Sequence, residues 1–233
     1  MAGLTPSQTV AIRLFVETDA NLAIGGPAGT GKSHTMERLR KVCDSRGLKH
    51  TTLAPRGACA FLGGGETIHR KLGTLPHGRP FWANATEMRT CLWRALGGRL
   101  GGGKSSRKAL ERADFFRGLD VLLVDEIYLA EAGLLAMLDL TARELRGVDA
   151  PMGGLRVVVV GDPYQLTPKG STHVWRPVAL GPPPADSEDS EDEDAEPKPT
   201  GHLLKALRTW DDLQFTHITL KVLTTFYFLL YND

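Results

Sequence analysis

The sequence has few cysteines and no long apolar stretch. Its 233 residues include three cysteines, Cys43, Cys59 and Cys91, and these form no Cys-x-x-Cys pair. Neither a disulfide framework nor a zinc site is therefore indicated, and a reducing compartment is the simplest interpretation. No run approaches the roughly 20 apolar residues that a membrane helix needs, and the N-terminus lacks the pattern of a secretory signal. We expect an intracellular protein that does not act in a membrane.

Acidic residues are concentrated in one place. The net charge is +1, yet eight acidic residues and no basic ones lie between Asp186 and Glu196. Without this tract the chain carries 28 basic and 19 acidic residues, a net of +9. A basic body is compatible with a polyanionic partner such as nucleic acid, and also with an ordinary solvated surface.

The acidic tract itself is flanked by prolines and cannot form a core. We expect residues 181–201 to be a disordered loop. Mimicry of nucleic acid, or phosphorylation of Ser187 and Ser190, is a second interpretation.

Short apolar runs alternate with helical patterns over about the first 170 residues. Apolar strands without polar alternation are typical of a parallel sheet covered on both faces, and helices between them indicate βαβ units. Strands are expected at residues 20–24, 50–53, 121–124 and 155–160. Helices are expected at residues 32–46, 57–62, 86–96, 105–117 and 131–145. The sequence therefore predicts a three-layer α/β domain with a parallel sheet.

Residues 26–33, Gly-Pro-Ala-Gly-Thr-Gly-Lys-Ser, fit the phosphate-loop pattern G-x-x-x-x-G-K-[ST]. They follow a predicted strand and open a predicted helix, which is the context that this motif requires. Glycines let backbone amides wrap a β-phosphate, and the helix N-terminus adds partial positive charge. Lys32 would reach the β- and γ-phosphates, and the Ser33 hydroxyl would bind Mg²⁺. The motif predicts ATP and Mg²⁺ as cofactors.

A second stretch, residues 98–105, fits the same pattern. It follows a predicted helix, and five of the seven residues from Gly97 to Gly103 are glycine, so a chance match is easy. We interpret this stretch as a flexible basic loop and not as a second nucleotide site.

Polar side chains follow two further predicted strands. Asp125 and Glu126 come directly after the apolar run at 121–124, and Gln165 follows the run at 155–160. Because α/β sheets bind ligands at the carboxyl ends of their strands, these side chains should lie beside the phosphate loop. Asp125 would hold Mg²⁺, Glu126 would deprotonate the attacking water, and Gln165 would sense the γ-phosphate or that water.

The ordered set of motifs resembles the first motor domain of superfamily-one B DNA helicases, the RecD-like and Pif-one-like group. The resemblance covers roughly residues 4–168, from Leu-Thr-Pro-Ser-Gln at 4–8 to Gly-Asp-Pro-Tyr-Gln-Leu at 161–166. Leu-Ala-Pro-Arg-Gly-Ala-Cys-Ala at 53–60 and Thr-Ile-His at 67–69 are similar to segments that contact DNA in the family.

The resemblance implies a RecA-like P-loop NTPase domain over residues 1–180. It also implies ATP-driven 5′-to-3′ movement along single-stranded DNA and unwinding of forked duplexes, in replication, repair or recombination. The nucleus or a nucleoid is then the expected location.

The resemblance also implies roles for individual residues. Catalysis would depend on Lys32, Glu126 and Gln165, and Mg²⁺ would be held by Ser33 and Asp125. ATP would be bound by a glutamine that reads adenine in the family and by the phosphate loop, that is by Gln8, Gly26, Pro27, Ala28, Gly29, Thr30, Gly31, Lys32 and Ser33. DNA would be contacted by Pro55, Arg56, Gly57, Thr67 and His69. Arg56 stands where the family usually has threonine, and its charge suits a phosphate contact.

The chain departs from the family after Pro168. Only 65 residues follow, which is too few for a second motor domain of about 150 residues. We interpret residues 202–233 as the start of a truncated second motor domain, an incomplete C-terminal segment. No arginine follows Arg208, so the arginine that touches the γ-phosphate in the family is missing. The apolar run at 222–231 should dock on the first domain, dimerise or aggregate.

Two functions remain open at this point. The first is an ATP-dependent DNA helicase or its N-terminal motor domain, acting on single-stranded or forked DNA. The second is a truncated, non-enzymatic module that binds ATP and DNA, since arginine fingers are worth roughly 10³–10⁵ in rate in related systems. A second chain could supply the missing motor domain. An RNA-directed ATPase resembling PhoH-like proteins is a closer rival, and the segments at 53–60 and 67–69 argue against it.

Overall fold

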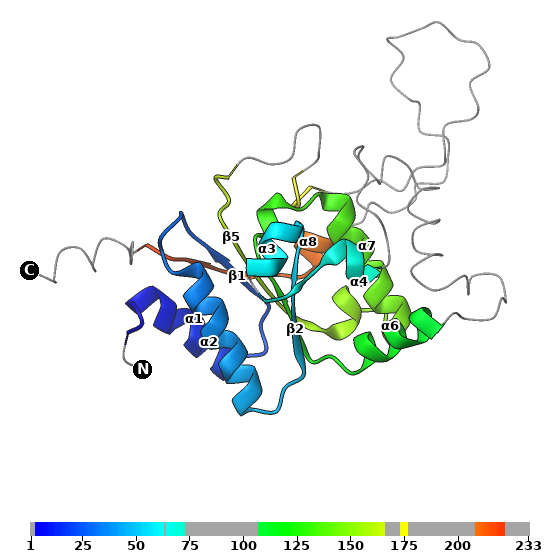
Figure 1. Cartoon of the computed structure of the whole chain (residues 1–233). Helices are drawn as coiled ribbons and strands as arrows, with labels where there is room; N and C mark the ends of the chain where they lie inside the picture. The colour runs from blue at the N-terminus through cyan, green and yellow to red at the C-terminus, as the bar shows by residue number, and fades with distance from the viewer. Residues whose placement is uncertain (1–2, 63, 73–106, 166–172, 177–207, 222–233) are drawn as a thin grey trace, which may run out of the picture.

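The computed structural model describes residues 3–62, 64–72, 107–165, 173–176 and 208–221 (Figure 1). They contain a six-stranded sheet in the order β3-β2-β4-β5-β1-β6, and every neighbouring pair is parallel. The strands are β1 (Leu22–Gly25), β2 (His50–Ala54), β3 (Glu66–Thr67), β4 (Val121–Val124), β5 (Arg156–Gly161) and β6 (Thr216–Thr219). The predicted α/β class with a parallel sheet is confirmed.

Helices cover both faces of the sheet, as Figure 1 shows. The helices α1 (Pro6–Glu17) and α2 (Lys32–Ser45) pack on one face. The other face is covered mainly by α7 (Ala132–Arg146), with α4 (Ile68–Leu72) and α6 (Arg107–Arg117) beside it. The remaining short helices are α3 (Gly57–Leu62), α8 (Thr209–Asp212), η2 (Ile127–Leu129) and η3 (Pro151–Gly154).

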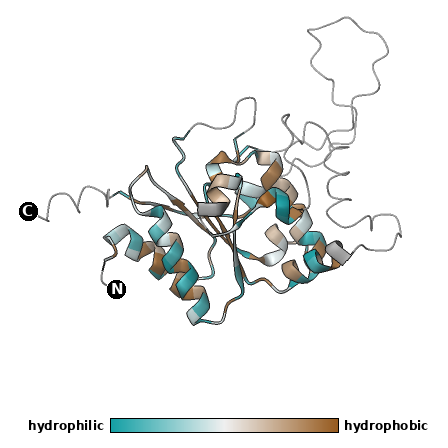
Figure 2. Ribbon diagram, viewed as in Figure 1, coloured by the Kyte–Doolittle hydropathy of each residue, from teal (hydrophilic) through white to brown (hydrophobic). Residues whose placement is uncertain are grey.

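Successive residues of a strand contribute to two different cores. Val157 and Val159 of β5 pack with α4, α6 and α7, whereas Val158 and Val160 pack with α1 and α2. Because side chains alternate across a strand, a strand covered on both faces must be apolar at each position. This explains the unbroken valine run, and Figure 2 shows apolar strands enclosed by helices with hydrophilic outer faces.

The described elements follow most of the predicted ones. The strand at 121–124 is β4, and the other predicted strands differ from β1, β2 and β5 by one or two residues at their ends. The helix α1 was not predicted; it begins at Pro6, after the N-cap residue Thr5, whose side chain forms a capping box with that of Gln8. The predicted helix at 86–96 and the basic loop at 98–105 lie outside the described residues.

The C-terminal part of the described chain belongs to the same sheet. Strand β6 pairs with β1 along its whole length, and Asn21 Nδ2 donates a hydrogen bond to Leu213 O (2.7 Å). Residues 208–221, which the sequence analysis assigns to the start of a second motor domain, therefore lie in the same sheet as the strand that precedes the phosphate loop. The acidic tract and the apolar run at 222–231 lie outside the described residues.

Strand β6 was not predicted, because it forms by pairing with the edge of β1. Pairing there satisfies the backbone of a short strand of which only Ile218 is buried, so the strand has little apolar signal in the sequence.

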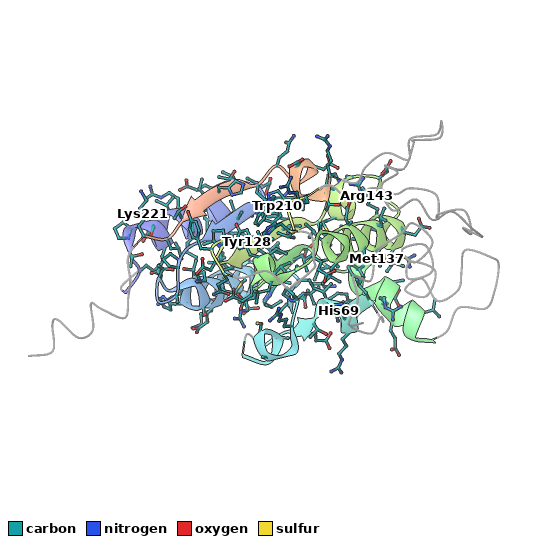
Figure 3. All side chains as sticks on the ribbon, turned by 90° about the horizontal axis from the view of Figure 1, so that it is seen from above. His69, Tyr128, Met137, Arg143, Trp210 and Lys221 are labelled. Atoms are coloured by element: carbon teal, nitrogen blue, oxygen red, sulfur yellow. The ribbon has the colours of Figure 1, made fainter. Side chains whose placement is uncertain are left out.

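A buried carboxylate joins α7 to the segments on either side of it. Asp139 Oδ1 accepts hydrogen bonds from Arg143 Nε (2.9 Å) and from Met152 N of η3. Its Oδ2 accepts from Thr209 Oγ1 of α8 (3.3 Å). Next to this link, the Trp210 and Tyr128 rings lie 5.9 Å apart between their centroids (Figure 3). The C-terminal segment is thus held by buried polar and aromatic contacts.

Candidate functional site

The phosphate loop connects the end of β1 to the start of α2. Gly29 and Gly31 have φ values of 79° and 82°, in the left-handed region that favours glycine. A Cβ at Gly26 would lie 2.8 Å from Thr30 Oγ1 and 3.0 Å from Leu220 O, so no side chain fits there. The Gly26 amide donates to Gly161 O (3.3 Å) at the end of β5. These contacts fix the loop against the carboxyl edge of the sheet.

The Lys32 ammonium is folded into this loop. Its side chain is largely buried, and Nζ donates to Gly26 O (2.8 Å) and Pro27 O (3.0 Å). Pro27, Ala28 and Gly29 are exposed at the tip. A cation enclosed by a turn at a helix N-terminus is the arrangement that binds an anionic phosphate group.

Asp125 and Glu126 lie at the end of β4, at the same edge of the sheet. Burial raises the pKa of Asp125, against the effect of a hydrogen bond from Glu126 N to its Oδ1 (3.0 Å). Burial also raises the pKa of Glu126, and the negative charge of Asp125 raises it further. Oxygen Oε2 of Glu126 is buried and has no hydrogen-bond partner among the described residues. Such an unpaired carboxylate oxygen is suited to accept a proton from a water molecule.

Gln165 lies in the turn that follows β5. Its backbone amide donates to Asp162 O (3.2 Å), and Asp162 Oδ1 accepts from Tyr164 N (3.0 Å). The side chain of Gln165 is exposed. The turn is next to the phosphate loop because the end of β5 is bonded to Gly26. The structure thus brings together the three strand ends that the sequence singled out.

The donor set fits a magnesium ion bound together with a nucleotide. Within the described ranges, no three His, Cys, Asp or Glu side chains are grouped so that they could hold a metal by themselves. Mg²⁺ usually takes only one or two protein ligands and fills its octahedron with phosphate oxygens and water. Asp125 and the exposed Ser33, at the start of α2, are hard oxygen donors of this kind.

Gln8 lies next to the phosphate loop, and its side chain is directed toward the backbone of that loop. It is fully buried, and its Oε1 accepts from Thr5 N (2.9 Å). Its Nε2 donates to Thr30 O (3.4 Å) and Gly31 O (3.2 Å) of the phosphate loop. The amide of Gln8 is therefore already used by protein groups.

The residues expected to contact DNA lie on two neighbouring strand ends. Arg56 and Gly57 are exposed after β2, whereas Pro55 is buried. Thr67 ends β3, which pairs with β2, and its Oγ1 accepts from Arg70 N (3.1 Å) at the start of α4. His69 lies on α4 and is half-buried. Both segments therefore reach the edge that carries the phosphate loop, on the far side of β4.

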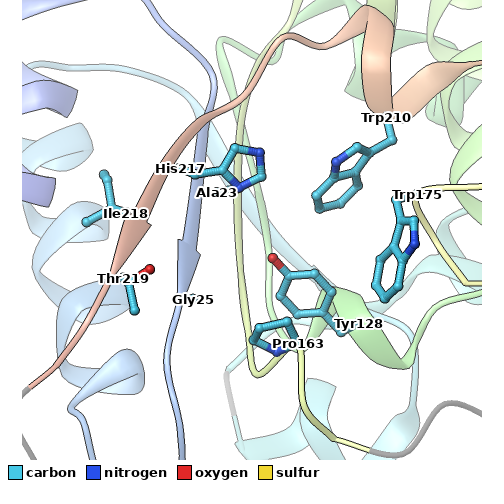
Figure 4. Close-up of a pocket in the computed structure, with 9 residues that line it drawn as sticks. All are labelled: Ala23, Gly25, Tyr128, Pro163, Trp175, Trp210, His217, Ile218 and Thr219. Atoms are coloured by element: carbon cyan, nitrogen blue, oxygen red, sulfur yellow. The ribbon is translucent and has the colours of Figure 1, made fainter.

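An aromatic pocket of about 370 Å³ lies beside the turn after β5 and was not foreseen from the sequence (Figure 4). Its wall includes three large aromatic rings, and it is lined by Ala23, Gly25, Tyr128, Pro163, Trp175, Trp210, His217, Ile218 and Thr219. Burial raises the pKa of the Tyr128 phenol. The tryptophans come from segments distant in sequence, so periodicity gives no sign of the pocket.

Two further observations concern the cysteines and the search for a membrane-spanning helix. Burial raises the pKa of the Cys43 thiol to about 11, and burial also raises the pKa of Cys59, which disfavours the nucleophilic thiolate form of both residues. In the part of the chain that is described, no helix is long and apolar enough to span a bilayer.

The chain matches one known family and several named proteins. Residues 3–185 match the family described as AAA domain. The ATP-dependent DNA helicase PIF6 of Trypanosoma brucei brucei is 34% identical over 72% of this chain and 19% of its own length. The ATP-dependent DNA helicase Pif1 of Bdellovibrio bacteriovorus is 30% identical over 71% of this chain and 33% of its own length. The chain thus spans at most a third of these relatives.

Solved structures share the fold. The Pif1 helicase of Candida albicans superimposes with a TM-score of 0.65 at 21% identity, over 96% of this chain and 41% of that one. A Bacteroides Pif1 bound to ssDNA gives a TM-score of 0.53 at 27% identity, over 71% of this chain and 33% of that one. The similarity therefore covers the sheet and the phosphate-loop edge described above.

Proposed function

Because the chain belongs to the AAA domain family and its described part is a Pif1-like motor domain of superfamily-one B, we propose that it is the first motor domain of an ATP-dependent DNA helicase. The observation that carries the proposal is the shared sheet edge. The phosphate loop, the Asp125–Glu126 pair and the turn with Gln165 meet there, with Arg56 and Thr67 farther along the same edge.

In this proposal, the chain's own residues bind and activate the reactants. Mg²⁺–ATP supplies the phosphoryl group that is transferred to water. Lys32 exchanges its carbonyl acceptors for β- and γ-phosphate oxygens, and the loop from Gly26 to Ser33 surrounds the phosphates with amides. Ser33 and Asp125 hold the metal ion. Glu126 accepts the proton of the attacking water, for which its raised pKa and unpaired Oε2 suit it.

The same edge also provides the proposed contacts with DNA. Arg56 neutralises a phosphate of single-stranded DNA, and Pro55, Gly57, Thr67 and His69 contact its backbone. Gln165, exposed in the turn after β5, senses the γ-phosphate. With a second motor domain, from this protein or from a partner chain, ATP turnover would drive 5′-to-3′ movement and unwinding of forked DNA. Such work belongs to replication, repair or recombination, in a nucleus or nucleoid.

The test is ATP turnover by the full chain with and without single-stranded DNA. Lys32→Ala should abolish turnover and weaken Mg²⁺–ATP binding. The control is Lys41→Ala, which removes an exposed lysine of the same helix that forms an ion pair with Glu37 (2.6 Å). K41A should behave as wild type. Turnover that K32A does not change would contradict the assignment.

Binding without turnover would favour the second candidate, a nucleotide-binding module that needs arginines from another domain. In that case K32A should still weaken binding. Absence of nucleotide binding in the wild-type chain would rule out both candidates.

A further inference from the structure

The aromatic pocket beside the turn after β5 has walls made largely of flat rings (Figure 4). The ring centroid of Tyr128 lies 6.0 Å from that of Trp175 and 5.9 Å from that of Trp210. The His173 ring stacks on Trp175, with 4.5 Å between the centroids, and so fixes the orientation of this indole. Among the described residues that line the pocket, none is acidic and none is a lysine or an arginine. Such walls suit a neutral planar ring and not a phosphate or another ion.

The phenol of Tyr128 gives this pocket a hydrogen-bonding group. Only 7% of the residue is exposed, and burial raises the pKa of the hydroxyl, so it stays protonated at neutral pH. Among the described residues, none forms a hydrogen bond with this hydroxyl. Figure 4 shows it directed into the space bordered by His217 and Trp210. The hydroxyl can therefore donate a hydrogen bond to a polar atom of a ligand ring.

Exposed cations and a further exposed ring lie close to the pocket residues in the chain. Arg176 follows Trp175 directly, Arg208 precedes Trp210 by two residues, and both arginines are exposed. Tyr164, in the turn after β5, is 90% exposed. Proteins bind single-stranded nucleic acid with this combination, in which aromatic rings stack on bases and cations neutralise phosphates.

The pocket lies on the face of the sheet that also carries the proposed DNA contacts of α4. Tyr128 packs in the same apolar cluster as Ile68 and Leu72 of that helix. Strand β3, which precedes α4, is four strand spacings from β1, which lines the pocket. At about 4.8 Å for each spacing the separation is about 19 Å, which a few nucleotides of single-stranded DNA can cover.

We propose that this pocket takes a base of single-stranded DNA, which stacks on Trp175 and accepts a hydrogen bond from the Tyr128 hydroxyl. The inference rests on the proposed function. It adds a base site to the phosphate and backbone contacts at Arg56 and Thr67.

A base in this pocket lies beside two segments that lead to the nucleotide site. Tyr128 is two residues after Glu126, and Pro163 is two residues before Gln165. The Tyr128 ring also packs closely on the end of β5, since a Cβ at Gly161 would lie 2.8 Å from its Cδ2. The base site and the nucleotide site are therefore formed by the same strand ends.

The first experiment measures the affinity of the full chain for oligothymidylate and for an abasic strand of the same length. The two strands carry equal charge, so the difference between their affinities reports contacts with bases. Wild type should bind oligothymidylate more tightly. Trp175→Leu keeps apolar bulk without an aromatic ring. W175L should lower the affinity for oligothymidylate about tenfold and leave that for the abasic strand unchanged.

The matched control is Trp175→Phe, which keeps an aromatic ring at the same position. W175F should retain most of the preference for oligothymidylate, because any aromatic face can stack on a base. Equal losses in W175L and W175F would contradict stacking at this position.

A second variant, Tyr128→Phe, keeps the proposal testable if W175L folds poorly. It removes only a hydroxyl to which no described residue is hydrogen-bonded, so the packing of the ring is kept. Y128F should lower the affinity for oligothymidylate about fivefold, which corresponds to one net hydrogen bond. Its affinity for the abasic strand should equal that of wild type.

Two results would overturn the inference. One is equal affinity of wild type for the two strands, as expected if the pocket serves an apolar side chain of a protein. The other is a preference for oligothymidylate that neither W175L nor Y128F reduces, which would place the base contacts elsewhere. If wild type binds neither strand, the proposed DNA-binding function itself is wrong. That failure is distinguishable, because it removes the affinity for the abasic strand as well.

Discussion

At the scale of single residues, Glu126 combines a backbone conformation that is rare for a non-glycine residue with a buried carboxylate oxygen. Its φ of 51° lies in the left-handed region, which costs a non-glycine residue about 1–3 kcal/mol. The turn that follows it packs closely on the end of β5, since a Cβ at Gly161 would lie 2.8 Å from Tyr128 Cδ2 and 3.3 Å from Ile127 N. Oxygen Oε2 of Glu126 is buried and has no hydrogen-bond partner among the described residues.

Glu126→Gln should reduce ATP turnover by about 10²–10⁴-fold, because general-base catalysis is lost. Affinity for Mg²⁺–ATP should stay close to that of wild type, since the phosphate contacts remain. The measurements are steady-state turnover and nucleotide titration of the same preparation. A loss of binding as large as the loss of rate would contradict the assigned role.

The raised pKa of Glu126 also predicts a pH-dependent stability difference. A carboxyl group with a higher pKa in the folded state than its ordinary 4.5 stabilises the fold while it is protonated. That contribution is fully present below the unfolded pKa and is lost as the pH rises through the folded pKa. Glu126→Gln should therefore raise the free energy of unfolding at pH 7.5.

The gain should shrink as the pH falls toward 4.5. Urea unfolding at a series of pH values checks this, and a gain that is constant with pH would show that burial does not raise the pKa of Glu126.

Arg56 predicts a salt effect on DNA binding. Arg56→Ala should weaken binding to single-stranded DNA of any sequence and reduce the slope of log K against log salt by about 0.7. The control is Arg13→Ala, an exposed arginine on α1 that pairs only loosely with Glu17 (3.7 Å). R13A should keep the wild-type slope. Fluorescence anisotropy at several salt concentrations measures both, and equal slopes in wild type and R56A would exclude this contact.

At the scale of elements, the helix α7 is the centre of one half of the domain. It contacts η3, α6 and α8, and its buried side chains cover the sheet. A single carboxylate, that of Asp139, accepts hydrogen bonds from η3, from α8 and from Arg143 of α7 itself. Arg143 on the same helix bridges Asp139 to the exposed Asp149 (3.1 Å). The two aspartates therefore share a partner but differ in burial.

Asp139→Ala should lower the free energy of unfolding by about 3 kcal/mol, because buried donors lose their acceptor. Asp149→Ala should lower it by less than about 1 kcal/mol, since an exposed ion pair is screened by water. Chemical denaturation of both variants measures the difference. Similar losses in D139A and D149A would contradict the view that Asp139 joins α7 to α8 and η3.

At the scale of the whole molecule, two segments about 190 residues apart in sequence share one sheet edge. Strand β6 covers the edge of β1, and Asn21 joins both neighbours of β1 by donating to Leu213 O and accepting from Val157 N (2.8 Å). An exposed edge on a buried parallel strand would be prone to aggregation. Residues 208–221 are thus part of the unit that carries the phosphate loop.

Truncation tests this assignment. A chain that ends at Lys221 should unfold cooperatively at the temperature of the full chain and bind Mg²⁺–ATP. A chain that ends at Ala206 lacks α8 and β6, so it should aggregate or melt at a markedly lower temperature. Calorimetry of both truncated chains provides the measurement. Equal stability of the two would place residues 208–221 outside the first domain.

Much of the site was predictable from the sequence because it depends on local patterns. A phosphate loop is a continuous motif, and β4 is an apolar run with its two carboxylates at one end. Parallel strands bring their carboxyl ends to one edge of the sheet, so the sequence alone predicts that Lys32, Glu126 and Gln165 lie close together. Strand β3, which brings Thr67 beside the end of β2, was not among the predicted strands.

Contacts between segments that are distant in sequence were decided only by the tertiary structure. The four residues of β6 are mostly polar, and only the edge of β1 makes them a strand. The aromatic pocket gathers rings from segments that show no common periodicity. The Gln8 side chain donates to the carbonyls of Thr30 and Gly31, which lie 22 and 23 residues later in the chain. Local propensity cannot predict such contacts, because each depends on groups that approach only after the chain has folded.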